Sequence, residues 1–591
     1  MRMRNKTFQI ILILVALCQT ALFAQTSRVT GKVTGPDNKP VAGASVTISG
    51  TTNGTVTDTD GNFTLSVPAN ASLFINSIGF ASQIIKVSNS SSLSVQLVPG
   101  ESSKLDEVVV TGYSVQRKKD IVGSVAVVDV KALKSAPSSS AMQALQGQAS
   151  GVDVTNNGSP GAPSLIFIRG ITGFSNTPLV LIDGIQGDIN NVPADDVESI
   201  QVLKDAGAAA IYGARGSNGV IVITTRKGKS GTPAVTYDSY YNFQIPNKGS
   251  SLNTIRAQEY SSIMTSINLS SALFAGGKLP DFLWRGPNGR GVGAAGDPNV
   301  NPALYNFDRA NRSKNYIISQ VNKNGQGGDV YDAIFRPALM MNHSVSASGG
   351  TDRANYLFSL GYLDQQGTLE NTYLKRYNVR ANTTFKIKDN IRMGENLNIY
   401  YNDNPQSPAN GNFGPIQQAF SHLPFLPLYD IAGNYAGAFA GPGDEVGDWG
   451  NAKADVTLVD NNRRRSYGLI GNVFLEIDFL QHFTARTSFG GAISNFYDQT
   501  YKYIDYWKAS GGSDNSLTEN SGFATTAQWT NSLAYKNEFG KHNLSVLVGS
   551  ESIENKSRGL SASGQRFLVD DYNYLVLRNA QVFNSNPTTT S

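Results

Sequence analysis

The chain of 591 residues carries 49 lysines and arginines against 45 aspartates and glutamates, and its formal net charge of +4 is too small to favour a nucleic-acid partner. Charged residues make up only 16% of the chain, against about 25% in ordinary soluble domains. Glycine (59), tyrosine (25) and phenylalanine (27) are plentiful, which is typical of aromatic-rich β-structure, and the single cysteine, Cys18, excludes a disulfide framework within the chain.

Residues 1–24 have the pattern of a secretory signal peptide. Three basic residues precede the apolar run 10–17, which is too short to cross a bilayer as a helix, and cleavage is expected after Ala24. No later apolar run is long enough for a transmembrane helix. If the protein spans a membrane, we therefore expect it to do so as a closed barrel of strands.

Residues 25–99 read as short strands separated by turns. Phe63, Leu65 and Val67 alternate with polar residues after the Asp60-Gly61 turn, so each strand has one apolar face. The pattern predicts a small β-sandwich. This stretch contains no histidine and no spacing typical of metal ligands.

The segment 100–114 is a polar linker that contains one β-branched run, from Val108 to Thr111. This run is either a last strand of the preceding sandwich or a free strand-forming peptide. The breaker Pro99-Gly100 closes the sandwich module and favours the second interpretation.

Residues 115–229 predict a compact α+β globule. We expect a short helix that starts at Pro137, a helical turn with a capping box made by Asp195 and Glu198, and a short helix over 205–213. Apolar runs within the following stretches predict buried strands: 164–170, 178–184, 199–204 and 218–225.

The spacing of Gly213, Gly216 and Gly219 in the same globule raises the question of a phosphate-binding loop. No Gly-Lys-Ser/Thr follows, and the order is helix to strand, the reverse of the phosphate-binding fingerprint. A tight turn is therefore the favoured interpretation.

From residue 230 to residue 591 the apolar pattern has a period of two. One face of a representative segment carries Tyr377, Val379, Ala381, Thr383 and Phe385. The opposite face carries Asn378, Arg380, Asn382 and Thr384. Such strands, joined alternately by short turns and long loops, indicate an outer-membrane barrel, and a soluble sandwich is the alternative.

An enzyme is disfavoured by the distribution of reactive residues. The four histidines, His343, His422, His482 and His542, are scattered without metal-ligand spacing, and no G-x-S-x-G nucleophile elbow is present. We expect no catalytic residue, no metal site and no cofactor.

Several motifs of the chain resemble those of a known family. "LDEVVVTGY", "FIRG…TPLVLIDG" and "DDVESIQVLKDAGAAAIYGARGSNGVIVITTRKGK" are similar to the TonB box, plug core and plug-terminal signature of the SusC/RagA family of TonB-linked outer-membrane transporters. The likeness is clear to about residue 405 and looser beyond it. Residues 25–99 resemble a carboxypeptidase-regulatory-like (transthyretin-like) domain.

The resemblance implies roles for particular residues. Those expected to bind TonB are Asp106, Glu107, Val108, Val109, Val110, Thr111 and Gly112. Those of the plug motif are Arg169, Gly170, Asp183, Gly184, Lys204, Asp205, Tyr212, Gly213, Gly216, Asn218 and Gly219. For Arg169 two interpretations remain open: a buried side chain paired with barrel carboxylates, or one that is solvated or bonded to plug carbonyls.

The expected fold is therefore mainly β, with an N-terminal β-sandwich, an α+β plug domain (115–229) and the first part of a transmembrane antiparallel β-barrel (230–591). The resemblance implies import of an oligosaccharide, with a peptide as second choice, in the outer membrane with the plug and N-terminal domain facing the periplasm. The expected partners are TonB with its inner-membrane complex, a SusD-like surface lipoprotein and membrane lipids. The alternative is a secreted or cell-surface adhesin built from β-sandwiches.

Substrate-binding residues cannot be named from the sequence, although aromatic and polar residues are concentrated in 400–414 and 503–508. The region from 233 onward offers about ten period-two segments, whereas plugged transporters of this kind have roughly 22 strands. We therefore expect the chain to be the N-terminal part of a longer protein.

Overall fold

The structure is a computed structural model, and it forms two compact units, residues 1–107 and 108–591, which are described separately. It describes residues 26–590 except 52, 69–70, 78–79, 88–91, 99–107, 112–113, 118–123, 131–132, 134–136, 157, 171–176, 250–253, 268–272, 310, 406–413, 460–461, 513, 541 and 584–587. The predicted signal peptide therefore lies outside the described residues.

The first unit is a β-sandwich. One sheet has the order β4-β1-β7 and the other the order β3-β2-β5-β6. The strands are β1 (Thr26–Thr34), β2 (Ser45–Ile48), β3 (Gly54–Val56), β4 (Asn62–Pro68), β5 (Ser72–Asn76), β6 (Gln83–Lys86) and β7 (Ser92–Gln96). Alternate residues of β4, including Phe63 and Val67, are buried between the sheets, as their alternation predicts.

The second unit contains a globule, residues 124–229, here called the plug. Its sheet has the order β10-β15-β16-β13-β14, with β13 and β16 parallel. The strands are β10 (Val125–Val128), β13 (Leu179–Ile182), β14 (Ile185–Gln186), β15 (Val197–Leu203) and β16 (Val220–Thr225), with a separate hairpin of β11 (Val152–Thr155) and β12 (Leu165–Ile168). Ile221 and Ile223 of the middle strand β16 are fully buried.

Two local expectations for the plug are wrong. Helix α3 (Ala141–Ala144) begins after Ser140, whose Oγ accepts a hydrogen bond from the backbone N–H of Gln143 at 3.3 Å, and not at Pro137. The predicted capping box is absent, because η3 (Ala194–Asp196) has no side-chain cap and Glu198 already belongs to β15. The predicted helix over 205–213 is present as α4 (Ala206–Ala209) followed by η4 (Ala210–Gly216).

One antiparallel sheet, here called the large sheet, dominates the rest of the chain. Its strands are β17 (Gly231–Gln244), β21 (Ala338–Gly350), β22 (Ala354–Gln366), β23 (Tyr373–Lys388), β24 (Ile391–Asn404), β25 (Arg463–Phe479), β26 (Phe483–Lys502), β27 (Ser516–Phe539), β28 (His542–Gln565), β29 (Val582–Phe583) and β30 (Thr588–Thr590). Each long strand pairs with the next one in the chain, and among the described residues β17 pairs only with β21, so the sheet is not closed. A single continuous sheet overturns the alternative of soluble sandwiches in this region.

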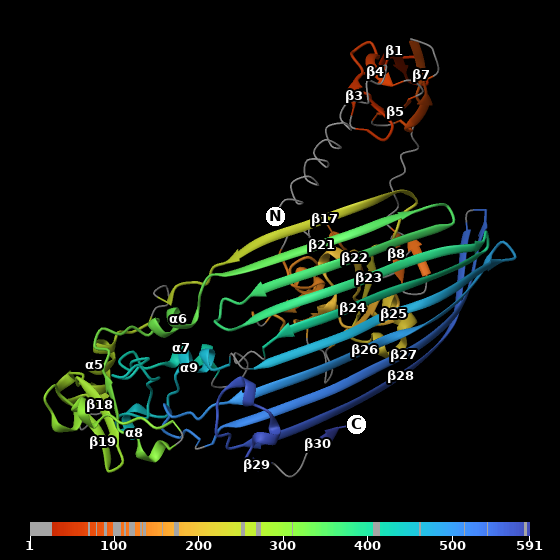
Figure 1. Cartoon of the computed structure of the whole chain (residues 1–591). Coiled ribbons are helices and arrows are strands. Elements are labelled where there is room, and N and C mark those ends of the chain that lie inside the picture. Colours follow the sequence, from red (N-terminus) through yellow and green to blue (C-terminus); the bar gives the residue numbers. More distant parts are fainter. Residues whose placement is uncertain are drawn as a thin grey trace, which may run out of the picture. The chain divides into compact units, whose positions relative to one another are not determined.

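The connections of the large sheet alternate in length, as predicted. The short ones span residues 351–353, 389–390, 480–482 and 540–541. The others span 245–337, 367–372, 405–462, 503–515 and 566–581. Figure 1 shows the long connections gathered at one end of the curved sheet.

The long connections fold into a layer of their own, here called the loop layer. It contains α5 (Ala257–Ile267), α6 (Asp329–Ile334), α7 (Pro415–Ser421), α8 (Gly443–Val446), α9 (Ala452–Thr457) and the sheet of β18 (Phe282–Gly286), β19 (Gly289–Gly293) and β20 (Ile317–Gln320). Phe274, Leu283 and Phe425 belong to one buried cluster that joins the first and third long connections. The loops are therefore packed against one another.

The two faces of the large sheet are the reverse of those of a soluble protein. On β23, Tyr377 and Val379 are 48% and 46% exposed, whereas Arg380 is 2% exposed. The same inversion holds on neighbouring strands, with Phe358 and Phe489 exposed. An apolar outer face and a buried polar inner face are what a membrane-embedded barrel requires. Within the described part of the chain, no helix has the length and apolar character needed to cross a membrane.

Ile221 offers a test of the plug sheet. The change Ile221→Asp would bury an unpaired carboxylate in the central strand, so we expect it to destabilise the plug by several kcal/mol. Hydrogen exchange of the β16 amides, measured on purified protein, should then become much faster. Ile221→Val should cost only about 0.5–1.5 kcal/mol. Equal protection in the aspartate variant and the parent would contradict the assigned fold.

Candidate functional site

The plug and the large sheet meet at a deeply buried arginine. The Nε atom of Arg380, on β23, lies 3.3 Å from Oδ2 of Asp196, and its Nη1 atom lies 3.8 Å from Oδ2 of Asp183. Both carboxylates belong to the plug, and their side chains are only 7% and 8% exposed. A charge removed from water needs such partners, because leaving it unpaired costs several kcal/mol.

Turns of the plug present the two carboxylates to the sheet. Asp183 directly follows β13 and has a φ of 50°, and Gly184 comes next with a φ of 90°. The oxygens of Asp183 accept hydrogen bonds from the backbone N–H and Oγ1 of Thr225, at 3.0 and 2.5 Å. The Oδ1 atom of Asp196 accepts one from Ser359 of β22 at 3.1 Å.

Amide side chains of the sheet bind the backbone of the plug around this arginine. Asn382 donates to the carbonyl oxygen of Arg226 at 2.6 Å, and Asn472 donates to that of Asp183 at 3.0 Å. Gln528 donates to the carbonyl oxygen of Gly184 at 3.0 Å. Each such bond contributes only about 0.5–1.5 kcal/mol net, because water can replace it.

Similar contacts lie nearer the loop layer. Arg376 donates to the carbonyl oxygen of Ser139 at 2.7 Å, and Asn402 donates to Oδ1 of Asn191 at 3.1 Å. The carboxylate of Asp195, which was expected to cap a helical turn, instead accepts a bond from Asn342 of β21 at 2.9 Å. The contact between plug and sheet is therefore extensively polar.

One apolar side chain of the sheet enters the plug. Ile470 of β25 is 8% exposed and belongs to the buried cluster of the plug. It lies against Gly187, where an added Cβ would come within 2.2 Å of its Cδ1 atom. The absence of a side chain at Gly187 therefore leaves room for Ile470.

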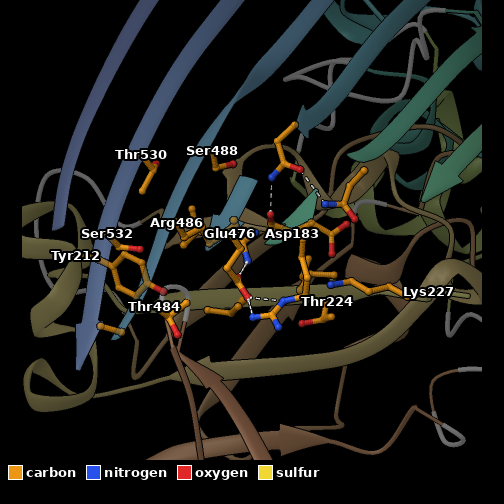
Figure 2. Close-up of a pocket in the computed structure, with 18 of the residues that line it drawn as sticks. Asp183, Tyr212, Thr224, Lys227, Glu476, Thr484, Arg486, Ser488, Thr530 and Ser532 are labelled. Carbon is orange, nitrogen blue, oxygen red and sulfur yellow. Dashed lines mark hydrogen bonds and ion pairs between the residues drawn. The ribbon is translucent and has the colours of Figure 1, made fainter. Parts of the chain in front are cut away.

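Beside these contacts, a cavity of about 420 Å³ lies between the plug and the large sheet. Figure 2 shows plug residues Asp183, Tyr212 and Lys227 and sheet residues Glu476 and Arg486 around it. Its walls carry several ion pairs. Glu476 contacts Arg392 at 2.5 Å and Arg486 at 3.3 Å, and Arg392 also contacts Asp478 at 2.8 Å. Polar walls of this kind can hold water between the plug and the sheet.

Arg169 and Gly170 do not lie at this interface. Both are exposed and have φ angles of 58° and 88°, and the backbone N–H of Arg169 donates to the carbonyl oxygen of Gly151 at 2.9 Å. The interpretation of Arg169 as a buried partner of barrel carboxylates is wrong. The structure has the reverse arrangement, with the arginine on the sheet and the carboxylates on the plug.

The remaining plug-motif residues organise the turns around α4 and η4. Asp205 caps α4, and the backbone N–H groups of Ser124 and Ala208 hold the pKa of its carboxyl below the usual value. Lys204 donates to the carbonyl oxygen of Ser150. Tyr212 is buried, and Asn218 is half-buried.

The three glycines form turns, as predicted. Gly213 and Gly219 have φ angles of 58° and 89°, in the left-handed region. A Cβ on Gly216 would lie 3.0 Å from the carbonyl oxygen of Ala209. Among the described residues, no group of three or more histidine, cysteine or acidic residues could hold a metal ion.

The peptide expected to bind TonB lies partly within the described residues. Val108–Thr111 form β8, which pairs antiparallel with β9 (Ser114–Arg117) in a two-stranded sheet. The strand is thus not part of the N-terminal sandwich. Asp106, Glu107 and Gly112 lie outside the described residues.

Comparison with known proteins identifies the family. Residues 117–220 match the TonB-dependent receptor plug domain, and residues 29–110 match the CarboxypepD_reg-like domain. TonB-dependent receptor P3 of Formosa agariphila is 30% identical over 95% of this chain and 51% of its own length. TonB-dependent receptor SusC of Bacteroides thetaiotaomicron is 28% identical over 93% of this chain and 53% of its own.

The chain belongs to the SusC/RagA family of TonB-dependent receptors. It spans about half the length of the curated relatives that it matches. A structure of the RagAB peptide importer in the closed-closed state is 26% identical, with a TM-score of 0.64 over 80% of this chain and 52% of that chain. The named relatives are receptors of a transporter class and not enzymes.

Substitution of Arg380 tests whether its buried ion pairs hold the plug against the sheet. The change Arg380→Met leaves two buried carboxylates without their cation, so we expect it to weaken the seating of the plug by about 3–5 kcal/mol. Protease accessibility of the plug in increasing guanidinium measures this loss. Combining Arg380→Met with Asp183→Asn and Asp196→Asn should recover most of it.

Arg353 provides the control for this test, because it lies exposed in a short turn and Arg353→Met should have no effect. If Arg380→Met behaved like Arg353→Met, the buried ion pairs would not hold the plug.

Two glycines of the plug motif allow a matched comparison. Gly213 and Gly219 both have positive φ, but an added Cβ meets nothing within 4 Å at Gly213, whereas at Gly219 it would lie 2.7 Å from Cδ1 of Ile168. We expect Gly213→Ala to cost about 1 kcal/mol and Gly219→Ala clearly more. Denaturant unfolding of the plug, followed by hydrogen exchange, should rank them in this order, and the opposite order would refute the packing at Gly219.

Proposed function

We propose that the receptor imports a nutrient across the outer membrane with energy delivered through TonB. One observation carries the proposal. The plug lies against the polar inner face of a sheet whose outer face is apolar, and many contacts between plug and sheet are hydrogen bonds that water could replace. A plug of this kind can shift or open when it is pulled, because water takes over the broken hydrogen bonds.

The handle for this pull is the segment from Asp106 to Gly112. A β-branched peptide can add as a strand to the sheet edge of a partner, with main-chain hydrogen bonds providing the grip. The pairing of β8 with β9 supports the strand-forming tendency of residues 108–111. TonB, with its inner-membrane complex, is the proposed partner, and the N-terminal domain and plug face the periplasm.

The proposed cargo is an oligosaccharide, with a peptide as the alternative, and a SusD-like surface lipoprotein is the proposed lid. The loop layer supports a protein partner because it exposes apolar side chains. They include Ile263 at 45%, Ile267 at 73%, Leu304 at 45% and Phe420 at 53%. A protein partner that covered these side chains would remove their apolar surface from water.

Uptake measurements test the proposal. Cells expressing the full-length receptor should accumulate labelled oligosaccharides, and deleting the gene of the proposed SusD-like lipoprotein should reduce accumulation. The receptor should fractionate with outer membranes, whereas an adhesin made of soluble domains should be released. Accumulation that persists after removal of TonB would refute an energised import.

Proline in the handle provides a sharper test. Proline removes a backbone donor and fixes φ near −65°, so Val109→Pro, or Val110→Pro if the register differs by one residue, should abolish energy-coupled uptake by the full-length transporter. Binding of cargo at the cell surface should remain, because the handle does not contact cargo. Val109→Ile should be nearly silent. Normal uptake in both proline variants would show that residues 106–112 are only a linker.

A further inference from the structure

The outer face of the large sheet changes from aliphatic to aromatic to charged over three successive rows of residues. The rows cross β22, β23, β24 and β25, which lie side by side (Figure 1). The row farthest from the loop layer consists of Leu360, Val379, Ile399 and Leu469. The middle row consists of Tyr362, Tyr377, Tyr401 and Tyr467. The row nearest the loop layer consists of Asp364, Lys375, Asp403 and Arg465. Because alternate residues of a strand share a face, all three rows lie on the outer face.

The tyrosine row marks the level at which the hydrocarbon of a surrounding membrane ends. Tyr377, Tyr401 and Tyr467 are 48%, 36% and 56% exposed. The rings of Tyr362 and Tyr377 have centroids 5.0 Å apart, so the row is continuous from one strand to the next. Aromatic girdles of this kind lie at the membrane–water interfaces of barrels. The aliphatic row therefore faces lipid tails, and the charged row faces lipid headgroups.

The two basic side chains of the charged row lack an ion-pair partner, whereas its carboxylates are at least partly buried. Asp364 is 9% exposed and accepts a hydrogen bond from Gln366 at 2.7 Å. The Oδ1 atom of Asp403 is buried. Arg465 is exposed and Lys375 is half-buried, and neither forms an ion pair with any other described residue. The basic groups are therefore available to an anionic group of a neighbouring lipid.

The spacing of these two basic residues suits a phosphorylated headgroup. Lys375 and Arg465 both lie opposite Asp403 in the register, on either side of β24. Neighbouring strands are about 4.8 Å apart, so the two backbone positions are about 10 Å apart. Long lysine and arginine side chains can extend along a lipid-facing surface and converge on one phosphate group. Arginine binds phosphate with two parallel hydrogen bonds.

We propose that Lys375 and Arg465 bind a phosphate group of lipopolysaccharide in the outer leaflet of the outer membrane. The inference rests on the orientation proposed above, in which the loop layer lies outside the cell. The charged row then lies at the level of the headgroups of this phosphorylated lipid. The site adds a lipid ligand to the receptor and does not involve the cargo.

Binding of lipopolysaccharide to the full-length receptor, purified in a neutral detergent, tests the site. The probe is fluorescently labelled lipopolysaccharide, and a second portion of it is stripped of phosphate with hydrofluoric acid. At low ionic strength, we expect the intact probe to bind about tenfold more tightly than the stripped one. Inorganic phosphate is added as a competitor and should not displace the labelled lipid.

Substitution of the two basic residues tests the assignment. Arg465→Gln should lower the affinity by about fivefold, because one basic group at a membrane surface contributes roughly that factor. Lys375→Gln should have a similar effect, and both changes together should lower the affinity by about 25-fold. Arg465→Lys keeps the charge and should retain most of the affinity.

Arg464→Gln is the matched control. It removes the same charge one residue away, on the inner face of β25, where Arg464 pairs with Asp498 at 3.5 Å. It should leave the affinity unchanged.

Equal effects of Arg465→Gln and Arg464→Gln, equal binding of the intact and stripped probes, or displacement by inorganic phosphate would each overturn the lipid site. Failure of the import function would appear differently. Lipopolysaccharide binding would then still depend on Arg465, in a receptor whose cells accumulate no labelled oligosaccharide.

Discussion

The buried charge of Arg380 governs how the receptor is assembled. A guanidinium group that is 2% exposed is tolerated only where opposite charges reach it, and here they come from Asp183 and Asp196 of another domain. The turn after β13 and the end of η3 must therefore face β23. The position of the plug against the sheet is therefore determined by the pairing of Arg380 with these two carboxylates.

The core of the plug is mainly apolar, whereas the contact between the plug and the large sheet is mainly polar. Within the plug, Ile200, Ile221 and Ile223 are fully buried, so the sheet of the plug remains intact unless much apolar surface is exposed. Between the plug and the large sheet, amide side chains such as those of Asn382 and Asn472 predominate. Because the free energy of such contacts is small, a pulling force would break this interface before it unfolded the plug.

Periodicity within one segment was enough to predict the strands of the large sheet and their two faces, because side chains alternate on every strand. The alternation places Asn378, Arg380 and Asn382 on one polar face. Their partners could not be recognised, because Asp183 and Arg380 are brought together only by the tertiary packing. The same limit explains Asp195, whose local pattern predicts a cap but whose carboxylate binds Asn342 from a distant strand.

For Arg169, sequence could identify the turn but not the direction of the side chain. Its φ of 58° belongs to a tight turn with Gly170, and the similar turn at Asp183 and Gly184 holds a buried side chain, so the turn alone does not set the direction.

The position of Ile470 against Gly187 has a consequence for the order of assembly. Ile470 belongs to the buried cluster of the plug, so one side chain of that core is supplied by β25 of the large sheet. The plug therefore reaches its final packing only after β25 has joined the large sheet. Folding of the plug and of the large sheet is therefore coupled. A plug that docks before β25 is in place lacks one side chain of its own core.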